Sequence, residues 1–187
     1  MKKSKNSSVD QYLEHVAGIA GGDGKFFRCG GDSDLPIIVA AYDAVPEPGC
    51  LTAFTFGLSS ATHPEWINSR PELVISVNST DYAWALAMGE MVNRGRSEHL
   101  FSYGSILNFG QPVSDESAMS AFLVFACDIL EDEDITVSLN DRIVHISQIY
   151  PIYTEEISLI KKIGAEKFFS GLDIDFFDIR RPPVISM

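Results

Sequence analysis

The stretch that decides the fold is residues 35–58, LPIIVAAYDAVPEPGCLTAFTFGL. Residues 35–42 are rich in isoleucine and valine, which suits a buried strand. Residues 45–49 contain two prolines, which fix the backbone and remove hydrogen-bond donors, so they predict a turn or loop. Residues 51–58 follow with the β-branched and aromatic content of a second strand. The middle of the chain therefore indicates a sheet.

The rest of the chain adds strands in runs, with helices at its start, middle and end. Four further stretches have strand composition: 72–77, 106–109, 121–127 and 143–149. Helices are predicted after a cap at Ser7 or Ser8, over residues 81–93, and from a cap at Thr154 through Ile163. Runs of strands favour an α+β fold, in which a central mixed, mostly antiparallel sheet is flanked by helices.

Nothing in the chain has the composition of a linker, so we expect one domain. Residues 1–8 are polar and predict a flexible N-terminal tail, and residues 9–187 form the domain. No apolar segment follows the early lysines as in a signal peptide, and no apolar run approaches the ~18 residues of a membrane span. The three cysteines are far apart and predict reduced thiols in a cytoplasmic protein.

The charge balance limits the classes of partner. The 187 residues carry 14 Lys and Arg against 26 Asp and Glu, a net charge of −12. Phosphate binding needs clustered cations, so we expect no nucleic acid partner, and an anionic membrane surface is disfavoured as well. A basic protein partner is allowed, and the acidity would steer its approach. Solubility alone is the other explanation of this acidity, and both stay open.

Catalytic motifs are missing from the chain. The segment 57–61 lacks the second glycine of a G-x-S-x-G nucleophile elbow, and the histidines form no spaced pair. The acidic run 131–134 lacks the alternation and glycine of a calcium loop, and it must be solvated. Asp173, Asp175 and Asp178 alternate with apolar residues, as in a cation site or an exposed edge or turn. The sequence therefore predicts a binding protein that is not an enzyme and holds no metal or cofactor.

Three blocks, taken in order, resemble a known family. The first contains Phe-Gly-Leu-Ser at residues 56–59, the second runs from the strand at 71–77 to residue 109, and the third contains Q-I-x-x-x-x-T-E-E from Gln148. The third block continues to D-x-R-R at residues 178–181. Together they are similar to the suppressor of fused domain family over roughly residues 45–182. Physically, the blocks concern the fold: we expect Thr154 to cap a helix, and Asp178 to hold Arg180 or Arg181.

The resemblance implies an α+β domain with a central mixed sheet flanked by helices. In animals, suppressor of fused pairs this domain with a second one and clamps an extended peptide of a Gli-type transcription factor. Here we expect only the first domain, and the tyrosine and aspartate that the animal family places after Ser59 have no clear counterpart. The resemblance therefore assigns no peptide-gripping residue. Short bacterial members are proposed to include immunity proteins of polymorphic toxin systems.

The leading hypothesis is a non-catalytic bacterial protein-binding module, an immunity protein that neutralises a toxin domain by direct binding. If the toxin is a basic nuclease, the acidic side chains are candidate contacts: Glu131, Asp132, Glu133, Asp134, Asp173 and Asp175. One alternative is a small-molecule enzyme of unknown reaction, using a pocket lined by His63, Trp66 or His99. The other is a self-associating structural protein that pairs exposed strand edges. Whether the chain is a monomer or a homodimer stays open.

Overall fold

The computed structural model describes residues 7–30 and 35–186. Its described strands form one eight-stranded sheet in the order β1-β2-β3-β4-β8-β6-β5, with β7 paired to β8 off this path. The pair β4–β8 is parallel and the other pairs are antiparallel. The strands are β1 (Lys25–Cys29), β2 (Ile37–Asp43), β3 (Leu51–Phe56), β4 (Arg70–Val77), β5 (Ile106–Asn108), β6 (Ala121–Phe125), β7 (Thr136–Ser138) and β8 (Ile143–Ile152). The predicted α+β fold with a mixed, mostly antiparallel sheet is confirmed.

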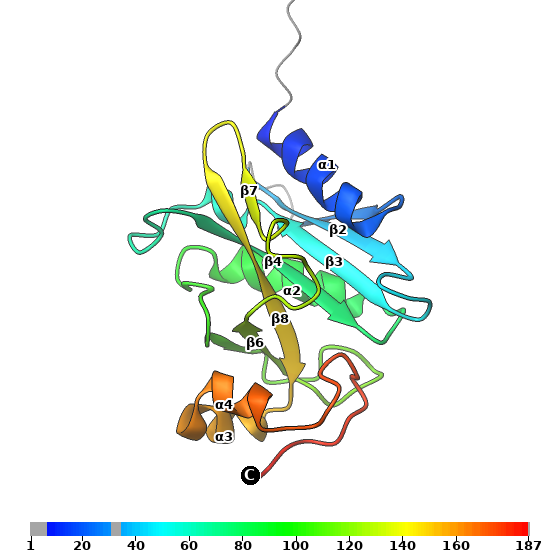
Figure 1. Ribbon diagram of the computed structural model, residues 1–187. Helices are drawn as coiled ribbons and strands as arrows, with labels where there is room; N and C mark the ends of the chain where they lie inside the picture. Colours follow the sequence, from blue (N-terminus) through cyan, green and yellow to red (C-terminus); the bar gives the residue numbers. More distant parts are fainter. Residues whose placement is uncertain (1–6, 31–34, 187) are drawn as a thin grey trace, which may run out of the picture.

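Helices cover both faces of the sheet and its lower end (Figure 1). They are α1 (Ser8–Ala20), α2 (Ala83–Gly95), α3 (Glu156–Ile163) and α4 (Ala165–Ser170). Helix α1 buries Tyr12 and Val16 on one face, whereas α2 buries Trp84 and Met88 on the other. Because successive strand residues point to opposite faces, a central strand needs apolar side chains at nearly every position. None of the helices in the described residues has the length and apolar composition that crossing a bilayer requires.

The start of α1 follows the predicted capping signal. The backbone N–H of Asp10 donates to Ser7 Oγ at 3.2 Å, and the Asp10 carboxylate accepts from the Ser7 N–H at 3.0 Å. Gly21, at φ 69°, ends the helix in the left-handed conformation that glycine adopts without strain. Helix α1 thus begins within the segment predicted as a tail, of which residues 1–6 lie outside the described residues.

Two strands were not predicted from the sequence. Strand β1 lies at an edge of the sheet, and most of its side chains are exposed or half-buried. Strand β7 has three residues and follows directly on the acidic run 131–134. Both segments lack a strong strand pattern of their own, because their pairing with β2 and β8 determines their conformation.

Two predictions about the C-terminal block are wrong. Thr154 does not cap α3, since its hydroxyl bonds to that of Ser120, and the Glu156 carboxylate accepts from the Tyr153 N–H at 2.9 Å instead. The Asp178 carboxylate accepts from the backbone N–H of Arg180 at 2.8 Å, and within the described residues it pairs with neither arginine side chain.

The arginine side chains of this block have other partners. Arg180 pairs with Glu116 at 3.0 Å, and Arg181 forms a buried two-point ion pair with Glu156, with Nη2 to Oε2 at 2.9 Å. Glu156 also accepts from the Val184 N–H at 2.9 Å. The Glu156 carboxylate therefore fixes the C-terminal segment to the start of α3.

Candidate functional site

A groove of about 530 Å³ opens beside β8. Its floor contains Pro71 of β4 with His145 and Ser147 of β8, and Pro71 is paired directly with His145 in the parallel register. These residues alternate along β8 with Val144 and Ile146, which are buried in the α1-side core. The groove thus uses the second face of the same two strands, at a place that α2 does not line.

The groove exists because β8 has two different antiparallel neighbours. Strand β6 pairs with residues 148–152 of β8, whereas β7 pairs with residues 143–145. Between the two pairings the chain leaves the sheet and follows residues 126–135. The sheet is interrupted there, and side chains from this connection line the opening.

One wall is the end of an aromatic stack. Tyr103 packs on Phe125 with ring centroids 4.2 Å apart, Phe125 packs on Phe169 at 4.4 Å, and Phe169 packs on Phe176 at 4.3 Å. Tyr103 is the outermost of these rings and is 58% exposed. The stack joins β6 to α4 and to the C-terminal segment, so it holds Tyr103 at the surface on a rigid support.

The groove lining also includes Trp66, in the connection between β3 and β4. Its indole Nε1–H donates to the Leu100 carbonyl at 3.0 Å, and the ring of His63 packs on it at 5.5 Å. Ile67, the next residue, is 85% exposed. Exposed aromatic and aliphatic side chains around an opening are typical of a surface that binds another molecule.

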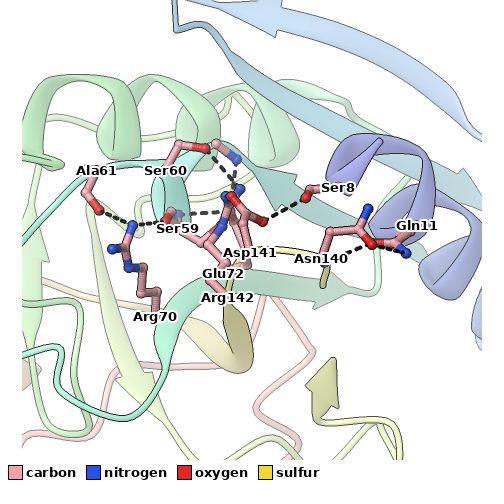
Figure 2. A network of polar contacts seen from close by, with 11 residues as sticks. Ser8, Gln11, Ser59, Ser60, Ala61, Arg70, Glu72, Asn140, Asp141 and Arg142 are labelled. Carbon is pink, nitrogen blue, oxygen red and sulfur yellow. Dashed lines mark hydrogen bonds and ion pairs between the residues drawn. The ribbon is translucent and has the colours of Figure 1, made fainter. Parts of the chain in front are cut away.

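A buried carboxylate fixes the base of the connection that carries Trp66 (Figure 2). Glu72 accepts from the N–H groups of Gly57 and Ser59 at 2.8 and 2.9 Å, and from the Thr55 hydroxyl at 2.7 Å. Burial raises the pKa of Glu72, against the opposing effect of the hydrogen bonds from Ser59, Thr55 and Gly57. These donors hold the short 3-10 helix Leu58–Ser60 against β4.

Two arginines complete this support (Figure 2). Arg70 donates to the carbonyls of Ser59 and Ala61 at 3.1 and 3.3 Å. Arg142, in the turn between β7 and β8, donates to the hydroxyls of Ser59 and Ser60 at 3.1 and 3.0 Å. The network therefore ties the β3–β4 connection to the turn that precedes the groove floor.

The same turn is tied to α1. Asp141 accepts from the Ser8 hydroxyl at 2.7 Å, and the Asn140 N–H donates to Gln11 at 3.0 Å (Figure 2). Three segments that are distant in the sequence thus meet in one polar network beside β8.

Two carboxylates at the groove have no partner within the part of the chain that the structure describes. Glu65 and Asp132 line the opening and are exposed. Within residues 7–30 and 35–186, neither side chain makes a hydrogen bond or an ion pair. No lysine or arginine is among the described residues that line the groove. The site is therefore aromatic and anionic.

The groove also holds a thiol and an imidazole, Cys127 and His145. Burial raises the pKa of the Cys127 thiol to about 11, so this group is protonated at neutral pH. Burial lowers the pKa of His145, which leaves its ring neutral there. An attacking cysteine needs a depressed pKa, and an ion pair with a charged imidazole is one way to obtain it. In this groove the pKa of the cysteine is raised and the imidazole is neutral, so Cys127 is not activated as a nucleophile.

The residues predicted for an enzyme pocket do not share one cavity. Trp66 lines the groove, whereas His99 lines a separate pocket of about 480 Å³ with residues of α2 and β5. His63 packs on the Trp66 ring, and its Nδ1 accepts from the Glu65 N–H at 3.2 Å. Trp66 and His99 therefore line two different openings, and His63 is a member of neither lining.

The acidic residues predicted as partner contacts fall into two separate places. Asp132 lines the groove, with Glu131 and Glu133 exposed beside it in the same turn. Asp134 is half-buried, and its carbonyl accepts from His15 Nε2 at 2.9 Å.

The second acidic group lies elsewhere. Asp173 and Asp175 are exposed, and Asp175 accepts from Asn78 at 2.9 Å, just beyond the C-terminal end of β4. Asp132 is near the other end of that strand, whose eight residues span roughly 25 Å. Among the described residues, no three His, Cys, Asp or Glu side chains are grouped as a metal ion would need.

Sequence reasoning missed Glu65, Tyr103 and Phe125 as members of the site. Each lies in or beside a polar loop and belongs to no motif. The available signal was an aromatic residue in a turn segment, Tyr103 before Gly104, where burial was not expected. No local pattern in the sequence indicates that these residues meet at β8.

Comparisons with known proteins agree with this fold. The sequence profile described as Suppressor of fused protein (SUFU) matches residues 31–182. A suppressor of fused homologue from Neisseria gonorrhoeae has a TM-score of 0.70 at 17% identity, over 92% of this chain and 94% of that chain. A chain of the Sufu–Fu complex has a TM-score of 0.68 at 13% identity, over 97% of this chain and 93% of that chain.

Drosophila Suppressor of Fused has a TM-score of 0.69 at 13% identity. The match covers 95% of this chain and 51% of the Drosophila chain, so this chain spans about half of that protein. A search of curated protein sequences gives no match. At these identities the solved structures show the fold, and the profile match over most of the sequence shows the family. The chain belongs to the suppressor of fused protein family.

Proposed function

We propose that this chain is a non-catalytic, cytoplasmic protein-binding domain, and that it acts as an immunity protein for a basic toxin domain. The observation that carries the proposal is the open groove in which Glu65 and Asp132 have no partner within the described residues and lie beside Trp66 and Tyr103. An aromatic and charged opening of this kind suits the surface of another macromolecule.

Binding is favoured over catalysis by the chemistry of the groove. Cys127 is held as a protonated thiol, and His145 is not charged to activate it. The buried Glu72 follows the groove residue Pro71 in the sequence. Both of its carboxylate oxygens accept hydrogen bonds that fix the β3–β4 connection. One solved relative is described as a Sufu–Fu complex, which supports protein binding as the general role.

The net charge of −12 supports a basic partner. Opposite charge increases the rate of encounter and disfavours acidic partners. A toxin domain that acts on nucleic acid must itself be basic, since it contacts phosphates. An acidic protein that covers such a surface would neutralise the toxin without a chemical step.

Co-expression with the product of the neighbouring gene tests the proposal. We expect the tagged chain to retain that product in low salt, to release more of it as the salt concentration rises, and to relieve growth inhibition caused by it. If the product is not toxic and does not bind in low salt, the proposed function is wrong.

Two pairs of variants locate the contact. The pair Glu65→Gln and Asp132→Asn should weaken retention, because it removes the unpaired carboxylates from the groove. The matched pair Asp173→Asn and Asp175→Asn removes the same charge at the other end of β4. An equal loss from both pairs would indicate general attraction by net charge rather than contact at the groove.

A further inference from the structure

We propose that the groove receives the side chain of one lysine or arginine of the partner, and that this side chain contacts the rings of Trp66 and Tyr103 and the carboxylates of Glu65 and Asp132, which all line the groove. This inference rests on the proposed function and specifies which chemistry of the partner the site recognises. The occupant is a cationic side chain presented by a protein.

The aromatic walls suit a cation. Tryptophan and tyrosine are the rings that attract a cation most strongly, and arginine also stacks on them. Tyr103 is supported from behind by Phe125 at 4.2 Å and is 58% exposed, so part of its ring surface faces solvent. Trp66 is fixed by its bond to Leu100. Both rings are already held in place, so binding of the ligand does not have to order them.

The two carboxylates supply the opposite charge. Asp43 and Asp141 are exposed acids with cationic partners, Lys25 at 2.9 Å and Arg142 at 2.6 Å. Other exposed acids, such as Glu131, Glu133 and Asp173, make no ion pair among the described residues, so the position of Glu65 and Asp132 at the groove is what distinguishes them. Glu65 and Asp132 have no cationic partner among the described residues. A cation that enters the groove therefore displaces no protein cation from these two carboxylates.

The groove floor does not oppose a positive charge. His145 is the titratable base on the floor, and burial lowers its pKa, so the ring is neutral at pH 7. Cys127 is a protonated thiol. The groove, at about 530 Å³, also exceeds the volume of one side chain, so the adjoining backbone of the partner can follow it.

A titration monitored by ¹⁵N-edited NMR tests this without the partner. The probes are the N-acetyl methylamides of arginine and lysine, with the citrulline compound as the uncharged analogue of arginine. We expect arginine and lysine to shift the Trp66 indole signal and the amides of Tyr103 and Ser147, and citrulline to leave them unchanged. The buried Trp84 indole is the internal reference.

Charge variants complete the test. The double variant Glu65→Gln, Asp132→Asn should weaken arginine binding about tenfold. Glu133→Gln removes an exposed acid from the same turn without touching the groove and should bind as the wild type does. Equal shifts with citrulline, shifts confined to other surfaces, no shifts at all, or an equal loss in Glu133→Gln would each overturn the inference.

The two proposals fail in different ways. If the partner is captured but binds a surface other than the groove, the immunity function stands and the proposed cation site is wrong. Specific arginine binding without any protein partner leaves the cation site in place and removes the immunity function.

Discussion

Two kinds of carboxylate occur in this molecule, and their surroundings are opposite. Glu72 and Glu156 are fully buried, and both oxygens of each accept hydrogen bonds from the protein. Glu65 and Asp132 are exposed at the groove and, within the described residues, have no partner. Glu72 and Glu156 stabilise the β3–β4 connection and the C-terminal segment, whereas the oxygens of Glu65 and Asp132 remain available to accept hydrogen bonds from a ligand. This difference indicates which acids determine structure and which are available for function.

The buried pair also shows two ways of accommodating a charge. Glu156 has the guanidinium of Arg181 as a counter-ion, with side-chain exposures of 0% and 3%. The donors to Glu72 are uncharged: two backbone N–H groups and the Thr55 hydroxyl. Burial raises the pKa of Glu72. We therefore expect Glu156 to depend on its cation and Glu72 to be sensitive to pH.

The largest effect is expected from Arg181→Met. This change leaves Glu156 buried without its counter-ion, and the loss of one partner of a buried pair costs about 3–5 kcal/mol in free energy of unfolding. Urea unfolding of the purified variant measures the loss. Adding Glu156→Gln should restore part of it, because it removes the unpaired buried charge, and the single amide oxygen can still accept from one of the N–H groups of Tyr153 and Val184. A double variant that is less stable than the single one would show that the charge is not the cause.

Glu72→Gln should change the pH dependence of stability. The raised pKa means that the folded chain keeps a proton on Glu72 at pH values where the unfolded chain has released it. The free energy of unfolding should therefore fall as pH rises from the ordinary glutamate pKa of 4.5 to the raised folded value. The glutamine of the variant cannot ionise. The free energy of unfolding of the wild type minus that of the variant, measured by urea unfolding, should therefore decrease as pH rises through this window. A constant difference contradicts the assigned protonation.

The smallest effect on stability is expected at the groove. Glu65→Gln and Asp132→Asn remove no hydrogen bond or ion pair found among the described residues, so each should change the free energy of unfolding by less than about 0.5 kcal/mol. The same variants should reduce retention of the partner, which separates function from stability. A loss of several times that size would show that Glu65 and Asp132 stabilise the fold, as Glu72 and Glu156 do.

Local signals in the sequence predicted much of the fold. The Ser7 cap and the Gly21 stop bound α1, and the Ile/Val-rich segment before Tyr42 is β2. Strands β1 and β7 were missed because pairing with a neighbour, rather than composition, determines them. The errors at Thr154 and Asp178 have a similar cause, since the partners of these residues and of the nearby arginines come from distant segments.

The site was less predictable than the fold. Asp132 was predicted as a contact from its charge, and it lies at the groove, but Asp173 and Asp175 were predicted on the same ground and lie elsewhere. Parallel pairing of β4 with β8 brings Trp66 and Pro71 to His145, and nothing local in the sequence encodes that pairing. Charge alone therefore identifies candidates, and topology selects among them.

Hydrogen exchange of this chain, alone and in complex with its co-purified partner, tests the central claim most directly. We predict slower exchange on binding at residues 65–71, 101–103 and 126–135, which surround the groove, and little change at residues 173–178. Protection confined to the C-terminal segment, or to the exposed edge of β1, would contradict the assignment of the groove as the binding site.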